Sequence, residues 1–162
     1  MLVYARNKHA NAIDLENGSV MAQAVVEDTF FAATVEIVVS IPEMEIISVE
    51  GGIRRAFNEE CEGVAIPLLQ RVIGLSIATG LIRSVNGLVG GAQGCPRLAD
   101  LVLECCDQVV LRFTADPIRK LLSGSAQGRT DVFKDFVGGN PRLVGSCIAF
   151  AKGSPLLEGV QA

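Results

Sequence analysis

Residues 90–98, Gly-Gly-Ala-Gln-Gly-Cys-Pro-Arg-Leu, place a cysteine where a glycine-rich turn gives way to a helix. Pro96 favours the first helical position, because its missing N–H would have no partner within the helix. Cys95 is therefore the predicted N-cap, with its sulfur near unpaired N–H groups and the positive end of the helix dipole. That position suits nucleophilic chemistry or metal ligation, and Arg97 adds a nearby positive charge. The alternative is a capping or buried thiol without chemistry.

Two further cysteines are candidate metal ligands. Cys61 lies in an acidic stretch between Glu60 and Glu62, where strands are expected to give way to the first helix. Neighbouring carboxylates disfavour a thiolate, so Cys61 is a poor nucleophile unless a cation is present, but the same carboxylates suit a divalent metal. Cys147 lies in an apolar C-terminal segment, where a buried structural thiol is the simpler interpretation. The metal hypothesis thus rests on Cys61, Cys95, Cys147 and Glu60, with zinc or an iron–sulfur cluster as the candidate cofactor.

The remaining candidates favour structural roles. Cys105 and Cys106 are adjacent on a predicted helix, so their side chains point about 100° apart and cannot easily share one ion. We expect this pair in the core. His9 is the single histidine and lies in a polar N-terminal stretch, whereas zinc hydrolases and acyl-transfer triads use histidine as ligand or base. Because no catalytic constellation is complete, we favour a non-enzymatic protein, with a thiol enzyme using Cys95 and Arg97 as an alternative.

Composition excludes several classes of partner. The formal net charge is −4, the 14 lysines and arginines are scattered, and aromatic residues make up only 5%. The basic surface and stacking platforms of a nucleic-acid-binding protein are therefore missing. Hydrophobic residues make up 49%, yet no apolar run approaches the ~18 residues of a membrane helix. The excess apolar surface predicts a core together with a subunit interface, and hence a homo-oligomer without a membrane partner.

The cellular compartment is inferred from the N-terminus and the cysteines. Residues 1–6 lack the basic region followed by an apolar core that marks a signal peptide. Five cysteines are an odd number, and their spacing is not that of a disulfide framework. We therefore expect a reduced, cytoplasmic protein.

The elements that position these residues begin with strands. Asn17-Gly18 is a strong hairpin signal between two apolar segments. From Phe30 to Ile41 apolar and polar residues alternate, which is typical of a strand with one buried face. We expect an antiparallel meander of about four strands, over residues 12–15, 19–26, 30–41 and 44–55.

Helical spacing replaces this alternation after about residue 58. Pro67 predicts a kink or a late start in the first helix, and Asp116-Pro117 predicts the start of a new one. Helices are expected over 64–73, 81–89, 98–113, from 116, over 130–137 and after Asn140-Pro141, with a loop over 123–129. Strands followed by helices indicate an α+β fold in which helices cover one face of the sheet. We treat residues 1–162 as one domain, strand-rich over 1–57 and helix-rich over 58–152, with a loose tail over 153–162.

Three motifs carry a resemblance to a known family. They are Glu60-Cys61 with the apolar helix that follows, the Gly-Cys-Pro-Arg-Leu motif around Cys95, and Ser-Cys-Ile-Ala around Cys147. Together they resemble an uncharacterised bacterial family, domain-of-unknown-function family twenty-eight eighty-nine. In the family's usual form these motifs read Gly-Cys-Thr-His-Leu and Ser-Cys-His-Ala, so Arg97 and Ile148 occupy its histidine positions. The resemblance implies a cytoplasmic protein without an assigned activity, and the missing histidines weigh against metal binding in this member.

A second resemblance is topological. A β-meander followed by cysteines at two helix starts is similar to iron–sulfur scaffold proteins of the NifU type, which hold zinc or a nascent cluster with thiolates from separate loops. This implies Cys61 and Cys95 as ligands, with Cys147 and Glu60 as additional candidates. Our first hypothesis is an unassigned protein with a thiol or small-ligand site at Cys95, and the metal or iron–sulfur carrier is the alternative.

Overall fold

The computed structural model describes residues 1, 3–58, 60–123, 126–151 and 153–159. By its internal contacts the chain forms two compact units, Met1–Arg112 and Phe113–Ala162. The sequence did not predict this division. These units are defined by their contacts and not by independent stability. The expectation that residues 1–162 fold as one domain therefore stays a prediction.

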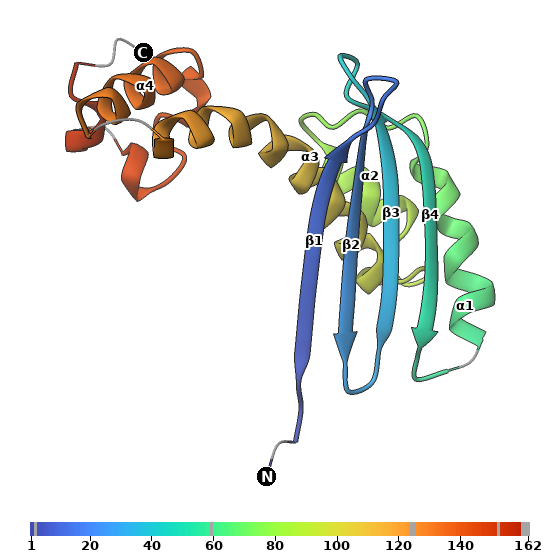
Figure 1. The fold of residues 1–162 in the computed structure, drawn as a ribbon. Coiled ribbons are helices and arrows are strands. Elements are labelled where there is room, and N and C mark those ends of the chain that lie inside the picture. Colours follow the sequence, from blue (N-terminus) through green and yellow to red (C-terminus); the bar gives the residue numbers. More distant parts are fainter. Residues whose placement is uncertain (2, 59, 124–125, 152, 160–162) are drawn as a thin grey trace. The chain divides into compact units, whose positions relative to one another are not determined.

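The first unit contains a four-stranded antiparallel sheet in chain order (Figure 1). The turn between the first two strands contains Gly18, whose φ of 82° favours glycine. The predicted meander is confirmed, although its first strand begins earlier than expected. The strands are β1 (Arg6–Asp14), β2 (Val20–Asp28), β3 (Ala32–Ser40) and β4 (Glu45–Arg55).

Helices cover one face of this sheet, as the α+β prediction requires. Alternate residues of the strands are buried on that face, because successive side chains of a strand point to opposite sides. They form one core with side chains from the helical elements, among them Leu69, Val85 and Leu101. The covering elements are α1 (Glu60–Ala65), the 3-10 helix η1 (Ile66–Val72), α2 (Leu81–Leu88) and the first part of α3 (Pro96–Ser123). In Figure 1, α2 and the first part of α3 lie behind the sheet, and α1 lies beside β4.

The first predicted helix is divided where Pro67 interrupts the α-helical pattern. Its start is at Glu60, and Pro67 lies at the beginning of η1, where a missing N–H is tolerated. The next helix, α2, follows Gly80, which adopts a φ of 94°. The division of the first helix moves an element boundary without changing which side of the sheet is covered, and α2 agrees with the helix expected over 81–89.

The long helix α3 lies along β1 within the first unit. Three ion pairs join charged residues of α3 to residues of the neighbouring strands β1 and β2. Their spacing of seven and eight residues along the helix keeps these charged residues near one face. The pairs are Arg97–Asp28 at 2.9 Å, Glu104–Lys8 at 3.1 Å and Arg112–Asp14 at 2.6 Å.

Two predicted boundaries in the C-terminal region are wrong. The helix expected to start at Asp116-Pro117 does not, because α3 continues through both residues to Ser123. Extending an existing helix needs no new nucleation, which favours continuation despite the hydrogen bond lost at proline. The loop expected over 123–129 is helical from Ala126, where α4 (Ala126–Gly138) begins. Residues 124–125 of that expected loop lie outside the described residues.

The second unit continues with short 3-10 helices. After α4, the Asn140 Nδ2 donates to the Phe136 carbonyl oxygen at 2.8 Å, and the rings of Phe133 and Phe150 stack at 5.8 Å. The helix expected after Asn140-Pro141 is a series of single turns, and one turn lies within the expected tail. These turns are η2 (Pro141–Leu143), η3 (Ile148–Phe150) and η4 (Pro155–Leu157). In the described part of the chain, no helix combines the length and apolarity needed to span a membrane.

Candidate functional site

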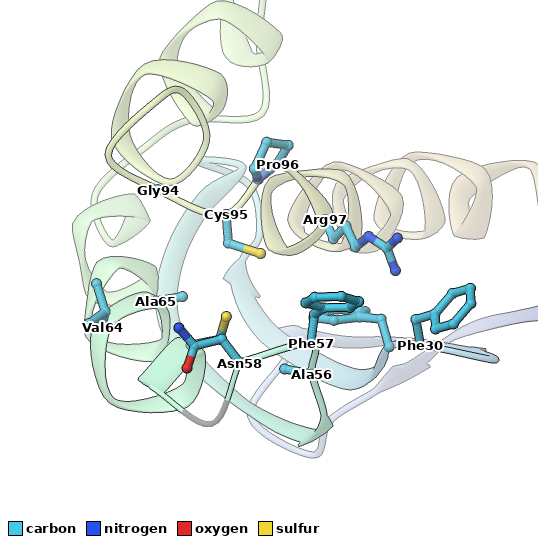
Figure 2. A pocket seen from close by; sticks show the side chains of 12 residues that line it. Phe30, Ala56, Phe57, Asn58, Val64, Ala65, Gly94, Cys95, Pro96 and Arg97 are labelled. Carbon is cyan, nitrogen blue, oxygen red and sulfur yellow. The ribbon is translucent and has the colours of Figure 1, made fainter.

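A pocket of about 640 Å³ lies at the end of the sheet where β2 and β4 finish. Its walls come from the turn between β2 and β3, the link from β4 to α1, α1 itself and the start of α3 (Figure 2). Most of the lining is apolar, and the polar groups are few. The lining residues are Phe30, Phe31, Ala56, Phe57, Asn58, Cys61, Val64, Ala65, Gly94, Cys95, Pro96 and Arg97.

Cys95 immediately precedes α3, as the sequence predicts. Helix α3 begins at Pro96, and the Cys95 carbonyl accepts a hydrogen bond from the Ala99 N–H at 3.1 Å. The Cys95 N–H donates to the Val89 carbonyl at 2.7 Å, which fixes the chain before the helix. Figure 2 shows the half-buried Cys95 side chain directed into the pocket. The reactivity expected of this thiol stays a prediction.

Gly94 allows this turn to pack closely against the end of the preceding helix, α2. A Cβ atom at Gly94 would overlap the backbone carbonyl oxygens of Val89 and Gly90. Backbone atoms cannot move aside as a flexible side chain can, so residue 94 has to be glycine for the turn to close. The glycine-rich segment therefore positions Cys95 by permitting close backbone packing.

The carboxylate of Asp28, at the end of β2, is the centre of a polar cluster beside the pocket. Its side chain has no solvent exposure. Oδ2 accepts from the Tyr4 hydroxyl at 3.0 Å, from Nε and Nη2 of Arg6 at 3.1 and 2.9 Å, and from Nη1 of Arg97 at 2.9 Å. Oδ1 accepts from the backbone N–H groups of Phe30 at 2.8 Å and Phe31 at 2.7 Å.

These donors keep Asp28 ionised. Burial alone would raise the pKa of this carboxyl, because it removes water from the charged form. Hydrogen bonds from the Phe30 N–H, Arg6, Tyr4 and the Phe31 N–H outweigh burial and hold the pKa of Asp28 well below its ordinary range. A buried carboxylate with this many donors is a fixed negative charge at neutral pH.

Arg97 joins the polar cluster to the pocket. Its guanidinium carbon lies 4.9 Å from the centre of the Phe31 ring, within cation–π distance. Only Nη1 of Arg97 contacts Asp28, and the side chain is 42% exposed, so N–H groups remain available for a ligand. Figure 2 shows the guanidinium at the side of the pocket where Phe30 lies. The sequence predicts Arg97 as a site residue but not its ion pair with Asp28.

Three apolar side chains surround the pocket and are unusually exposed. Phe57, on the link from β4 to α1, is 94% exposed, Val64 of α1 is 64% exposed, and Phe30 is 53% exposed. The Phe30 ring also stacks on Tyr4, with ring centres 6.2 Å apart. A cluster of exposed apolar groups around a concavity is typical of a binding site.

The predicted metal ligands are only partly brought together. Cys61 and Cys95 line the same pocket. Glu60 begins α1, but its side chain lies outside the described part of the structure. Cys147 is exposed and belongs to the second unit, at the start of η3, and Ile148 next to it is exposed as well. Among the described residues, no group of three or more His, Cys, Asp or Glu side chains could hold a metal ion.

The cysteine pair on α3 has the structural position that its spacing predicts. Cys105 and Cys106 are both buried, and Sγ of Cys105 lies 3.4 Å from the Val35 carbonyl oxygen. Burial raises the pKa of the Cys105 thiol well above its ordinary range and raises that of Cys106 to about 12. Neither thiol is a nucleophile in the folded protein.

The family comparison agrees with the resemblance carried by the motifs. The family described as "Protein of unknown function (DUF2889)" matches residues 6–110, which is more than half of the chain. The chain therefore belongs to this family. No curated protein and no solved structure matches it. Every residue of the pocket lies within the matched part, whereas Cys147 lies beyond it.

Several residues of the site were not predicted from the sequence. Asp28 follows an apolar strand and precedes a turn, which is an ordinary place for an aspartate. Phe30, Phe31 and Phe57 give a weak signal, since they are phenylalanines at strand ends in a chain with few aromatic residues. None of these features identifies a common pocket until the sheet brings the strand ends together.

Proposed function

We propose that this protein binds a small organic anion with an apolar body, in the pocket lined by Arg97 and Cys95. The observation that carries this proposal is the position of Arg97, a partly exposed cation in an otherwise apolar wall. The pocket volume lies within the range of about 300–1,000 Å³ that small-ligand sites commonly have. Few polar groups among apolar walls would orient a ligand while burial of its body supplies affinity.

The two ends of the pocket differ in chemistry, which would orient a ligand that has one charged end and one apolar end. Arg97 and Phe30 lie at one side, and Ala65 and Val64 lie at the other together with the uncharged Asn58, with Cys95 between the two sides (Figure 2). A carboxylate or sulfonate at Arg97 would place an aliphatic or aromatic body along the apolar side. The guanidinium fork suits such groups because it can donate two parallel hydrogen bonds.

Local charge supports an anion as well. Arg6 and Arg97 share Asp28, while Arg54 and Arg55 share Glu27. Within this network four arginines share two carboxylates, in a chain whose formal net charge is −4. Among these six groups the cations outnumber the carboxylates, which favours an anionic ligand beside Arg97, whereas Glu62 of α1 adds a negative charge next to the pocket residue Cys61.

Calorimetric titration with octanoate and with octanol tests the proposal, since the two ligands differ mainly in charge. We expect octanoate to bind and octanol to bind at least roughly tenfold more weakly, because a hydrogen bond to a charged group contributes about 1.5–3 kcal/mol. The Arg97→Gln variant should lose this discrimination. Equal affinity for both ligands, or octanoate binding that Arg97→Gln leaves unchanged, would exclude the proposal.

A matched control separates the ligand role of Arg97 from its structural role. Arg6 contacts the same carboxylate of Asp28 but does not line the pocket. The Arg6→Gln variant should therefore retain octanoate binding while disturbing the polar cluster similarly. If both variants lose octanoate binding equally, Arg97 supports binding by stabilising the polar cluster around Asp28 and not by contacting the ligand.

The shared position of Cys61 and Cys95 favours the metal carrier as a second candidate function. Two thiolates would need further ligands, and Glu60 is the candidate from the sequence that belongs to the same unit. Zinc or iron retained in stoichiometric amount after anaerobic purification, and lost in Cys61→Ser, would support this candidate. Protein that contains neither metal would exclude it. A cytoplasmic location and a homo-oligomeric state accompany both proposals, and sedimentation of the purified protein tests the oligomer.

A further inference from the structure

We propose that Cys61 and Cys95 form a redox-sensitive thiol pair, which a small disulfide such as oxidised glutathione converts into a disulfide across the pocket. The two cysteines are 34 positions apart in the sequence (95 minus 61), yet both line the same concavity. Cys61 comes from the first turn of α1, and Cys95 comes from the residue before α3. Both thiols are half-buried at the edge of the core, so a small oxidant entering the pocket can reach them.

The other three cysteines differ from this pair in their surroundings. Cys105 and Cys106 are buried in the core, where their thiols stay protonated. Cys147 is exposed in the second compact unit and serves as an internal reference for a solvent-accessible thiol. Of the five cysteines of the chain, Cys61 and Cys95 are the two that line the pocket.

Formation of the bond would bring the two sulfurs together across the pocket. A disulfide needs Cα atoms about 4.4–6.8 Å apart. The hydrogen bond from the Cys95 N–H to the Val89 carbonyl fixes the position of Cys95, and so does the close backbone packing that Gly94 permits. Cys61 is held less firmly, in a helix of six residues where its N–H donates to the Asn58 carbonyl at 3.1 Å. A helix this short depends on its packing, so α1 is the element that adjusts when the bond forms.

The chemistry is thiol–disulfide exchange and needs no cofactor. The Cys95 thiolate attacks oxidised glutathione, which forms a mixed disulfide and releases one reduced glutathione. The Cys61 thiolate then attacks the Cys95 sulfur, which forms the protein disulfide and releases the second reduced glutathione. Two protein thiols are oxidised, the glutathione disulfide is reduced to two thiols, and the two protons leave on the glutathione.

Closing this bond would change the pocket. It would join α1 to the start of α3 and reduce the space between the two walls. This consequence rests on the proposed function, since it requires a ligand that uses the same space. Oxidation should then weaken octanoate binding at least roughly tenfold, and reduction should restore it.

Peptide mapping after equilibration with oxidised glutathione tests the pair. We expect a linked peptide containing Cys61 and Cys95, with a mass two hydrogens below that of the reduced pair. The Cys147→Ser control should keep this linkage. In Cys61→Ser and Cys95→Ser the remaining thiol should carry one glutathione instead. If the wild-type protein carries glutathione on Cys61 and Cys95 separately, or leaves both reduced while Cys147 is modified, the pair is excluded. Alanine variants replace any serine variant that does not fold, as judged by circular dichroism.

Octanoate titration of the same samples separates this inference from the proposed function. A linked peptide together with weakened octanoate binding supports both. A linked peptide with unchanged octanoate binding overturns the closure of the pocket. If reduced protein does not bind octanoate, the proposed function fails, and the peptide map alone then decides whether the thiol pair exists.

Discussion

Nη1 of Arg97, in the first turn of α3, lies 2.9 Å from Oδ2 of Asp28, at the end of β2 and 69 residues earlier in the chain. The carboxylate is fully buried and the arginine lines the pocket. Asp28 is therefore a positioning residue, because it orients the cation that would meet a ligand without lining the pocket itself. The same carboxylate ties the N-terminal residues Tyr4 and Arg6 to this end of the sheet.

The Asp28→Asn variant should lose both stability and octanoate affinity. Asparagine keeps the size of the side chain, but one oxygen becomes an NH2 group that faces arginine donors instead of accepting from them. Thermal melting and octanoate titration measure the two effects. Asp14→Asn is the control, because Asp14 is exposed and pairs with Arg112 away from the pocket. Equal melting temperatures for the two variants would contradict the central role of Asp28.

Stability should fall in acid because of the same carboxylate. The folded-state pKa of Asp28 is held below its ordinary value of 3.8. The unfolded chain therefore binds a proton more readily, and the stabilisation is complete above about pH 4 and is lost as the pH falls further. Urea unfolding between about pH 6 and pH 3 should show a larger loss for the wild type than for Asp28→Asn. If the free energies of unfolding of the wild type and Asp28→Asn fall equally as the pH is lowered, other carboxyls cause the acid sensitivity.

Gly94→Ala should destabilise the protein and disturb the pocket. The new Cβ would overlap two backbone carbonyl oxygens, and overpacking of this kind typically costs about 1–3 kcal/mol. Gly87→Ala is the matched control, since Gly87 lies within α2 and has open space around its Cβ position. That control should be stabilised by roughly 0.5–1 kcal/mol. Urea unfolding of both variants checks the prediction, which fails if their stabilities change in the same direction.

Phe57→Ser should reduce ligand affinity while leaving stability within about 0.5 kcal/mol. Phe57 is almost fully exposed, so removing its ring costs few packing contacts in the absence of ligand. A bound apolar body would cover that ring, so octanoate binding should weaken. Ile148→Ser is the control, because Ile148 is equally exposed but is not among the residues that line the pocket. Similar octanoate affinity in both variants would remove Phe57 from the binding site.

Alkylation should divide the cysteines into two groups. Iodoacetamide at neutral pH should label Cys61, Cys95 and Cys147 in the folded protein, with Cys95 reacting fastest as its N-cap position suggests. Cys105 and Cys106 should react only after unfolding, because burial keeps them protonated and out of reach. Mass spectrometry of timed digests measures the rates. Labelling of Cys105 at the rate of Cys147 would mean that the core opens readily.

The sequence predicts the elements better than it predicts the site. Alternation over residues 30–41 and the Asn17-Gly18 turn identify the sheet, because those signals are local. Helical spacing likewise places Cys105 in the core. The start expected at Asp116-Pro117 fails because a local proline signal competes with the continuation of a long helix.

The contacts that assemble the pocket are not local, and this is why the sequence does not reveal them. The predicted start of α3 places Cys95 and Arg97 correctly, but nothing in their own segment identifies Asp28 as the partner of Arg97. The resemblances name Cys61 and Cys95 as joint ligand candidates, but their common pocket appears only when the end of the sheet brings α1 and the start of α3 together. Exposure of Phe57 is a property of the folded surface and has no counterpart in the sequence pattern.

The ion pairs that join α3 to β1 and β2 make the number of residues in this helix segment matter as much as their types. Inserting one residue between Arg97 and Arg112 would rotate one end relative to the other by about 100° and shift it by about 1.5 Å. Arg97–Asp28 and Arg112–Asp14 could then no longer form together. Substitutions on the outer face of α3 leave this alignment intact, whereas a change in residue number would misplace whichever end of the helix is held less tightly.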